Sequence, residues 1–177
     1  MTKISNLGVV ETLKGLNKKD FSSVEVTKEY LQLIENEKKL NAYIHFNTEK
    51  SLSLAELSDE RRAKNEALPL DGLPIAVKDI FCVKGERTSA CSKILENFIP
   101  NYESTVTSKL WQAGGVYIGK TSMDEFAMGS SNETSYFGSV VNPWSKEEEK
   151  LVPGGSSGGS ASAVAARLAP IALAAST

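Results

Sequence analysis

Residues 153–160 hold the densest group of chemically useful side chains in the sequence: they read Pro-Gly-Gly-Ser-Ser-Gly-Gly-Ser and precede a run of small residues. Glycines let backbone amides approach a ligand closely, serines supply hydroxyls, and a helix N-terminus adds partial positive charge. Three interpretations stay open: a flexible linker, a phosphate-binding loop, or the loop of a serine hydrolase. A linker does not usually run straight into a buried helix. A phosphate loop needs a lysine before its Ser or Thr, which residues 155–160 lack.

Lys78 is the second candidate, because it directly follows the apolar run 73–77 and precedes Ile80 and Phe81. Loss of hydration lowers the pKa of a lysine and makes its amine an available base. The alternative is a lysine whose ammonium group reaches the surface while its aliphatic stem is covered.

His45 is the one histidine in the sequence. A single histidine excludes a polyhistidine metal site. No nucleophile motif lies beside it in residues 40–46, so a surface or hydrogen-bonded structural histidine is the simpler interpretation. A hydroxyl nucleophile would then need another base, and a Ser–Lys pair is the arrangement that the sequence offers. The serine-rich segment and Lys78 therefore support each other.

Residues 72–79, Gly-Leu-Pro-Ile-Ala-Val-Lys-Asp, and the segment 154–160 together resemble the amidase signature family, whose members use a Ser-cis-Ser-Lys triad. Three more segments resemble one branch of that family, the A subunits of aspartyl/glutamyl-tRNA amidotransferases: residues 102–106, 123–138 and 142–144. The resemblance runs from about residue 70 to residue 177, and the N-terminal residues are compatible with it.

The resemblance implies a role for two residues and a place for a third. Lys78 would be the general base. Ser156, on a non-prolyl cis peptide bond, would relay the proton between Lys78 and the nucleophile. The nucleophilic serine of the family lies in a Gly-Gly-Ser turn, which we expect just beyond Thr177. Ser176 departs from the many relatives that have Asp there, and we interpret it as tolerated variation in a residue that supports the loop.

The resemblance also places Met128, Gly129, Ser130 and Ser131 near a glutamine site, although a core methionine is an alternative for Met128. It implies a glutaminase that supplies ammonia for the amidation of Glu-tRNA(Gln) or Asp-tRNA(Asn). We expect B and C subunits as partners, with mischarged tRNA bound mainly by the B subunit. We expect no cofactor in the glutaminase itself, and ATP and Mg in the B subunit. The alternatives are a stand-alone amidase of the same family acting on another amide, and a catalytically inactive fragment that lacks the nucleophile.

The elements that position these residues are predicted from the spacing of apolar residues and from the residues that begin and end helices and strands. Residues 1–66 are predicted to be a helical segment packed on the core, and the helix that begins near Ser22 starts with a candidate capping box. The charged run 59–62 is most simply a solvated face. From residue 67 onward, strands and helices alternate. The expected strands are 73–77, 116–118 and 171–175, and the expected helices are 104–113 and 161–168, with one or two helical turns in 122–128 and an irregular segment over 129–160.

This alternation predicts an α/β fold with a mixed sheet core flanked by helices, which the resemblance makes the amidase signature fold. Residues 67–177 would be the N-terminal part of that α/β domain, truncated after a buried strand. The 177 residues are 41% hydrophobic, which allows a core, and carry a formal net charge of −2, which excludes a global basic field for nucleic acid or anionic membrane. Two cysteines make no disulfide framework, so we expect a reducing, cytoplasmic compartment, or an organelle matrix. No targeting or membrane-spanning segment is predicted.

Overall fold

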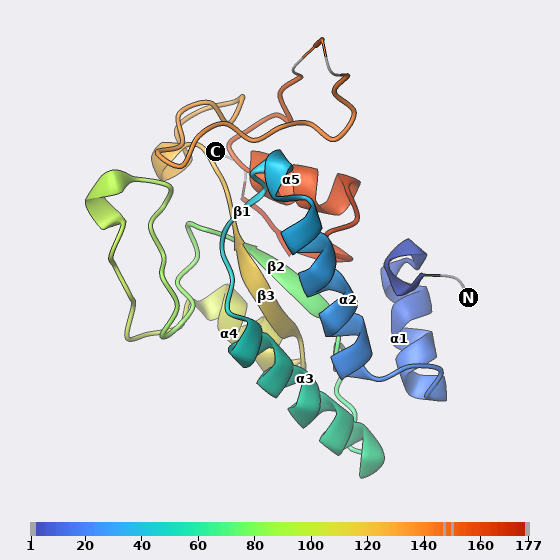
Figure 1. The fold of residues 1–177 in the computed structure, drawn as a ribbon. Helices are drawn as coiled ribbons and strands as arrows, with labels where there is room; N and C mark the ends of the chain where they lie inside the picture. The colour runs from blue at the N-terminus through green and yellow to red at the C-terminus, as the bar shows by residue number, and fades with distance from the viewer. Residues whose placement is uncertain (1–2, 147, 150, 176–177) are drawn as a thin grey trace.

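The sheet of the computed structural model has four strands in the order β1-β3-β2-β4, within a structure that describes residues 3–146, 148–149 and 151–175 (Figure 1). The strands are β1 Tyr43–His45, β2 Pro74–Lys78, β3 Val116–Thr121 and β4 Ile171–Leu173. β2, β3 and β4 are parallel, whereas β1 is antiparallel to β3. Because parallel strands end at the same edge of a sheet, the residues that follow β2, β3 and β4 meet there.

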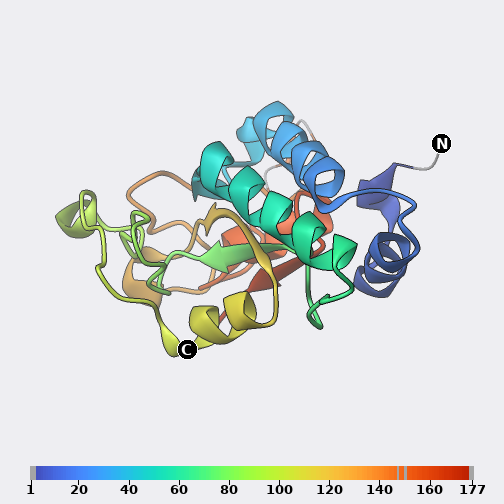
Figure 2. The same ribbon diagram turned by 90° about the horizontal axis from the view of Figure 1, so that it is seen from below.

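Helices surround this sheet. The α-helices are α1 Val9–Lys18, α2 Ser23–Asn36, α3 Thr48–Ala63, α4 Thr105–Gln112 and α5 Gly158–Ala165. Short 3-10 helices span Ile4–Asn6, Lys38–Leu40, Lys93–Leu95 and Glu125–Ala127. In Figures 1 and 2, α2 and α3 run side by side, and α4 lies on the other side of the strands. The α/β fold predicted from the sequence is confirmed, with element boundaries that differ by a few residues.

The main hydrophobic core lies between the N-terminal helices and the sheet. Its buried side chains include Leu16 of α1, Val26 and Tyr30 of α2, Ile118 of β3 and Leu168 after α5. Residues before and after position 66 therefore share one cluster. The division of the chain at that position stays a prediction.

The start of α2 is the capping box that the sequence predicts. Ser22 Oγ accepts a hydrogen bond from the backbone N–H of Glu25 at 3.1 Å, and the Glu25 carboxylate accepts one from the backbone N–H of Ser22 at 2.8 Å. Each side chain thereby satisfies an amide that the first turn of a helix leaves unpaired.

The charged run of α3 does not form the solvated face predicted for it. Asp59 accepts hydrogen bonds from the backbone N–H groups of Ser23 at 2.7 Å and Val24 at 3.1 Å, at the N-terminus of α2. Arg61 Nη2 lies 2.5 Å from Oδ1 of Asp71, whose side chain is fully buried. The prediction was wrong because these partners lie ten or more positions away in the sequence, outside the reach of a local pattern.

The buried strand predicted for residues 171–175 is also corrected. β4 is half-buried along its length, because it lies at the edge of the sheet in the described residues and pairs with β2 alone. The two central strands, β2 and β3, are buried at every position. The interior of the sheet is therefore where a desolvated polar group is found.

Candidate active site

Lys78 is the last residue of β2 and has no exposed surface. Its Nζ lies 2.7 Å from Oγ of Ser156 and 2.9 Å from the carbonyl oxygen of Ala175. Ser156 lies just before α5, and Ala175 follows β4. The structure thus brings together the two residues that the sequence analysis selected as base and relay, at the carboxyl edge of the parallel strands.

The surroundings of Lys78 shift its pKa downward. Burial is the largest cause, because the ammonium form loses its hydration. The carboxylate of Asp124 acts in the opposite direction and favours the ammonium form. A neutral amine at hydrogen-bond distance from a hydroxyl can accept its proton, as a general base does.

Ser156 is 3% exposed, and the peptide bond between Gly155 and Ser156 is cis, which confirms the non-prolyl cis bond implied by the resemblance. The carbonyl oxygen of Ser156 accepts a hydrogen bond from the backbone N–H of Asp124 at 3.0 Å. A Cβ atom at Gly155 would collide with the Asp124 carboxylate and with the backbone of Ser130 and Ser131. Only glycine lets these two loops pack so closely beside Ser156.

Asp124, which is fully buried, holds the loop that contains the predicted substrate residues. Its carboxylate accepts hydrogen bonds from the backbone N–H of Asn132 at 3.0 Å and from the hydroxyl of Thr134 at 2.9 Å. The loop between Asp124 and Asn132 therefore lies against Gly155, close to the Lys78–Ser156 pair.

The four predicted substrate residues lie on this loop. Met128 is 74% exposed, so the alternative interpretation as a core methionine is wrong. Gly129 and Ser130 are exposed and Ser131 is half-buried. A Cβ atom at Gly129 would collide with the Asp124 side chain. The loop thus combines a tightly packed backbone with side chains open to solvent, while a role in binding substrate stays a prediction.

The serines after Ser156 attach the start of α5 to the strand ends. Ser157 Oγ donates to the carbonyl oxygen of Ala175 at 2.7 Å. Ser160 Oγ lies 2.7 Å from Oγ1 of Thr121 and donates to the carbonyl oxygen of Leu173 at 3.1 Å. These contacts fix the segment against the sheet, so its interpretation as a flexible linker is wrong.

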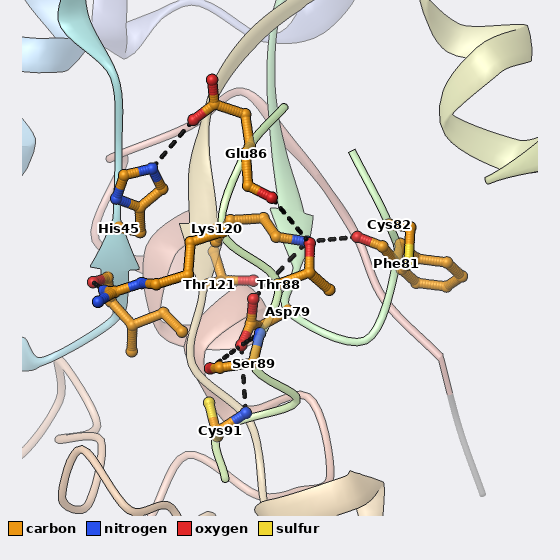
Figure 3. A network of polar contacts seen from close by, with 12 residues as sticks. His45, Asp79, Phe81, Cys82, Glu86, Thr88, Ser89, Cys91, Lys120 and Thr121 are labelled. Carbon is orange, nitrogen blue, oxygen red and sulfur yellow. Dashed lines mark hydrogen bonds and ion pairs between the residues drawn. The ribbon is translucent and has the colours of Figure 1, made fainter. Parts of the chain in front are cut away.

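A second buried lysine, Lys120, lies at the same edge and was missed by the sequence analysis. It has no exposed surface, its Nζ lies 3.6 Å from Oδ1 of Asp79, and it donates a hydrogen bond to the carbonyl oxygen of Phe81 (Figure 3). Lys120 comes near the end of a buried strand that begins with apolar residues, as Lys78 does, and that shared pattern is the signal that could have revealed it.

His45 forms a separate polar group. Its Nε2 lies 2.9 Å from Oε2 of Glu86 (Figure 3). The other carboxylate oxygen of Glu86 is 3.3 Å from Nζ of Lys50. The interpretation of His45 as a hydrogen-bonded structural histidine is confirmed. Among the described residues, no three His, Cys, Asp or Glu side chains are placed to hold a metal ion, and no helix is both long and apolar enough to cross a membrane.

Sequence comparison shows which family has this fold. A family model described as Amidase matches residues 25–177, and the chain belongs to the amidase family. It is similar to the A subunit of the glutamyl-tRNA(Gln) amidotransferase of Caulobacter vibrioides, with 56% identity over 167 residues, which are 93% of this chain and 34% of that protein. The corresponding protein of Xanthobacter autotrophicus is 55% identical over 170 residues, 95% of this chain and 34% of that protein. The chain thus spans about a third of the length of these curated relatives.

Solved structures confirm the amidase signature fold. A complex described as vestigial, from work on the origins of an s-triazine catabolic enzyme, has a TM-score of 0.88 and 34% identity, and the match covers 95% of this chain and 37% of that one. The A subunit of the glutamyl-tRNA(Gln) amidotransferase of Thermotoga maritima has a TM-score of 0.75 and 32% identity, and the match covers 96% of this chain and 34% of that one.

Proposed function

We propose that the protein containing this chain hydrolyses glutamine to glutamate and ammonia, as the glutaminase subunit of a tRNA-dependent amidotransferase. The observation that carries the proposal is the buried contact between Lys78 Nζ and Ser156 Oγ, at 2.7 Å. The choice of glutamine and of this assembly is supported by relatives that are named as A subunits of glutamyl-tRNA(Gln) amidotransferases, at 55–56% identity.

In the proposed mechanism Lys78 is neutral when glutamine is bound. A serine nucleophile, which we place beyond Thr177 on the basis of the family resemblance, attacks the side-chain amide of glutamine. It gives its proton to Ser156 Oγ as the Ser156 hydroxyl proton passes to Lys78 Nζ. The proton returns by the same route to the leaving ammonia. Water then hydrolyses the glutamyl ester and regenerates the serine.

The remaining roles are part of the same proposal. The loop of Met128, Gly129, Ser130 and Ser131 binds glutamine beside the relay serine. The ammonia passes to a partner B subunit, in an assembly with a C subunit, where ATP and Mg support amidation of mischarged tRNA. A cytoplasmic location stays a prediction from the sequence.

The decisive experiment replaces the base. In the full-length protein, Lys78→Ala is expected to reduce kcat for glutamine hydrolysis by about 10²–10⁴-fold, the usual contribution of a general base, while circular dichroism and the melting profile show a folded protein. Lys109→Ala, at an exposed lysine of α4, is the matched control and keeps its activity. Glutamate release is measured with and without the B and C subunits. Near-normal turnover of Lys78→Ala would overturn the assignment of the base.

The same assay separates the alternative of a stand-alone amidase. Turnover of a simple amide without partner subunits, together with no turnover of glutamine in their presence, would favour that function. The stand-alone amidase and the glutaminase would both use the Lys78–Ser156 pair.

A further inference from the structure

We propose that the buried Asp79–Lys120 ion pair is a positioning unit for the active site. The pair fixes the turn that begins at Lys78. Through residues 89–91, it also fixes the segment 123–136, which contains the loop of Met128 to Ser131. The inference deepens the proposed function, and its kinetic part rests on that function.

Lys120 closes the turn that follows β2. It lies on β3, which pairs with β2 so that Val77 is opposite Lys120. The backbone N–H of Phe81 donates to the carbonyl oxygen of Lys78 at 3.1 Å, and Nζ of Lys120 donates to the carbonyl oxygen of Phe81. The amine of Lys120 therefore ties the end of one strand to its neighbour, immediately after the candidate base.

Asp79 divides its two carboxylate oxygens between two partners (Figure 3). Oδ1 faces Nζ of Lys120 at 3.6 Å. Oδ2 accepts hydrogen bonds from the backbone N–H of Ser89 at 3.0 Å, from the Ser89 hydroxyl at 2.6 Å and from the backbone N–H of Cys91 at 3.1 Å. One carboxylate thus joins the lysine of β3 to the turn at residues 89–91.

Residues 89–91 also hold the segment after β3, through three hydrogen bonds. The carbonyl oxygen of Ala90 accepts from the backbone N–H of Phe126 at 3.0 Å. The carbonyl oxygen of Cys91 accepts from the backbone N–H of Tyr136 at 2.9 Å, and the Cys91 thiol accepts from the backbone N–H of Met123 at 3.3 Å. These anchors stand on both sides of the substrate loop.

Because the ion pair is buried, the loss of either side chain is expected to disturb the segments that it holds. Lys120 and Asp79 side chains are 0% and 1% exposed, so removal of one partner leaves an uncompensated charge in the interior. Burial lowers the pKa of Lys120, and the Asp79 carboxylate favours the charged form. A different buried carboxylate, that of Asp71, pairs with Arg61 on α3, whose side chain is 31% exposed. It provides a comparison ion pair that belongs to α3 and not to the turn at 89–91.

The first test measures hydrogen exchange in the full-length protein. Lys120→Met and Asp79→Asn are expected to speed amide exchange in peptides covering 85–92 and 123–136 by about tenfold or more, because the contacts that close these segments are weakened. Arg61→Met is the control and leaves exchange in these two peptides unchanged. If the rate of amide exchange in peptide 123–136 is the same in Lys120→Met and Arg61→Met, the proposal is overturned. If Lys120→Met fails to fold, Asp79→Asn decides by the same criterion.

The second test separates positioning from general loss of structure. In Asp79→Asn, kcat/KM for p-nitrophenyl acetate, a small activated ester that needs no substrate loop, is expected to fall because the turn after Lys78 is loosened. For glutamine, kcat/KM is expected to fall about tenfold further through a higher KM, because the loop of Met128 to Ser131 is loosened as well. Equal loss with both substrates contradicts positioning of the loop. If the wild-type protein does not hydrolyse glutamine, the proposed function fails, and hydrogen exchange still decides the role of the ion pair.

Discussion

Lys78, the last residue of β2, and Lys120, the last but one of β3, lie on neighbouring parallel strands and are both fully buried, and their partners give them different tasks. Lys120 has a carboxylate at 3.6 Å. Lys78 has a hydroxyl and a carbonyl oxygen, and within residues 3–146, 148–149 and 151–175 it forms no ion pair. Burial lowers the pKa of both lysines, but only the Lys78 amine lies at hydrogen-bond distance from the Ser156 hydroxyl, which suits a general base.

The pKa of Lys78 predicts how stability depends on pH. The pKa is lowered in the folded protein and returns to about 10.4 on unfolding, so between the two values the unfolded chain binds more protons. Stability from this group therefore rises with pH across that window. We expect the melting temperature of the wild type, relative to Lys78→Met, to increase as the pH rises toward the pKa of the unfolded chain.

The comparison with Lys78→Met cancels every other group that titrates in this range, including Lys120. Circular dichroism melts at matched pH values are sufficient. A difference that stays constant or falls with rising pH would contradict a lowered pKa for Lys78.

At the scale of elements, the N-terminus of α2 shows what a sequence reveals and what it does not. The Ser22–Glu25 capping box is visible in the sequence, because its two members stand three positions apart. The Asp59 carboxylate that binds the same helix start comes from α3, 35 and 36 positions away. A local pattern cannot encode that contact, so a charged run on a helix was interpreted as a solvated face.

Loss of the Asp59 carboxylate should cost more stability than loss of the local cap. We expect Ser22→Ala to lower the free energy of unfolding by about 1 kcal/mol. Asp59→Ala should lower it by about 2 kcal/mol, because a charged acceptor binds two backbone N–H groups there. Urea unfolding measures both. Glu60→Ala, at an exposed neighbour, is the control, and an effect of Asp59→Ala no larger than that control would refute the contact.

At the scale of the whole molecule, one core joins the N-terminal helices to the sheet. Ile34 on α2 is 3% exposed and belongs to the same cluster as Ala76 of β2 and Ile118 of β3. The sequence could predict this layering from helical periodicity and apolar strands. It could not predict that β4 is half-buried, because strand order depends on pairings between residues about 100 positions apart.

Truncation of one core side chain should therefore affect both layers. We expect Ile34→Ala to lower the free energy of unfolding by about 2–5 kcal/mol and to speed amide exchange in β2 and β3 as well as in α2. Mass-spectrometric hydrogen exchange resolves the separate elements. Val10→Ala, at a 57% exposed residue of α1, is the matched control. Faster exchange confined to α2 would show that the helices and the sheet are stabilised independently.

The candidate site was predictable from the sequence only where its residues lie in distinctive local patterns. Lys78 and Ser156 were selected because each lies in a distinctive local pattern and because histidine is scarce. The sequence does not single out Asp79 or Cys91, since each is unremarkable among its neighbours, and it marks Lys120 only by the apolar residues before it. Their importance arises from contacts that the parallel strands and the turn at residues 89–91 create.

The antiparallel pairing of β1 with β3 has a consequence for solubility. Tyr43 and His45 lie opposite Thr121 and Lys120, so a short strand from the N-terminal part of the chain covers the outer edge of the strand that carries Lys120. Uncovered, that edge would present a row of free backbone donors and acceptors on an apolar strand, which is a template for self-association. By pairing there, the N-terminal residues leave fewer free backbone groups at that edge for another chain to bind.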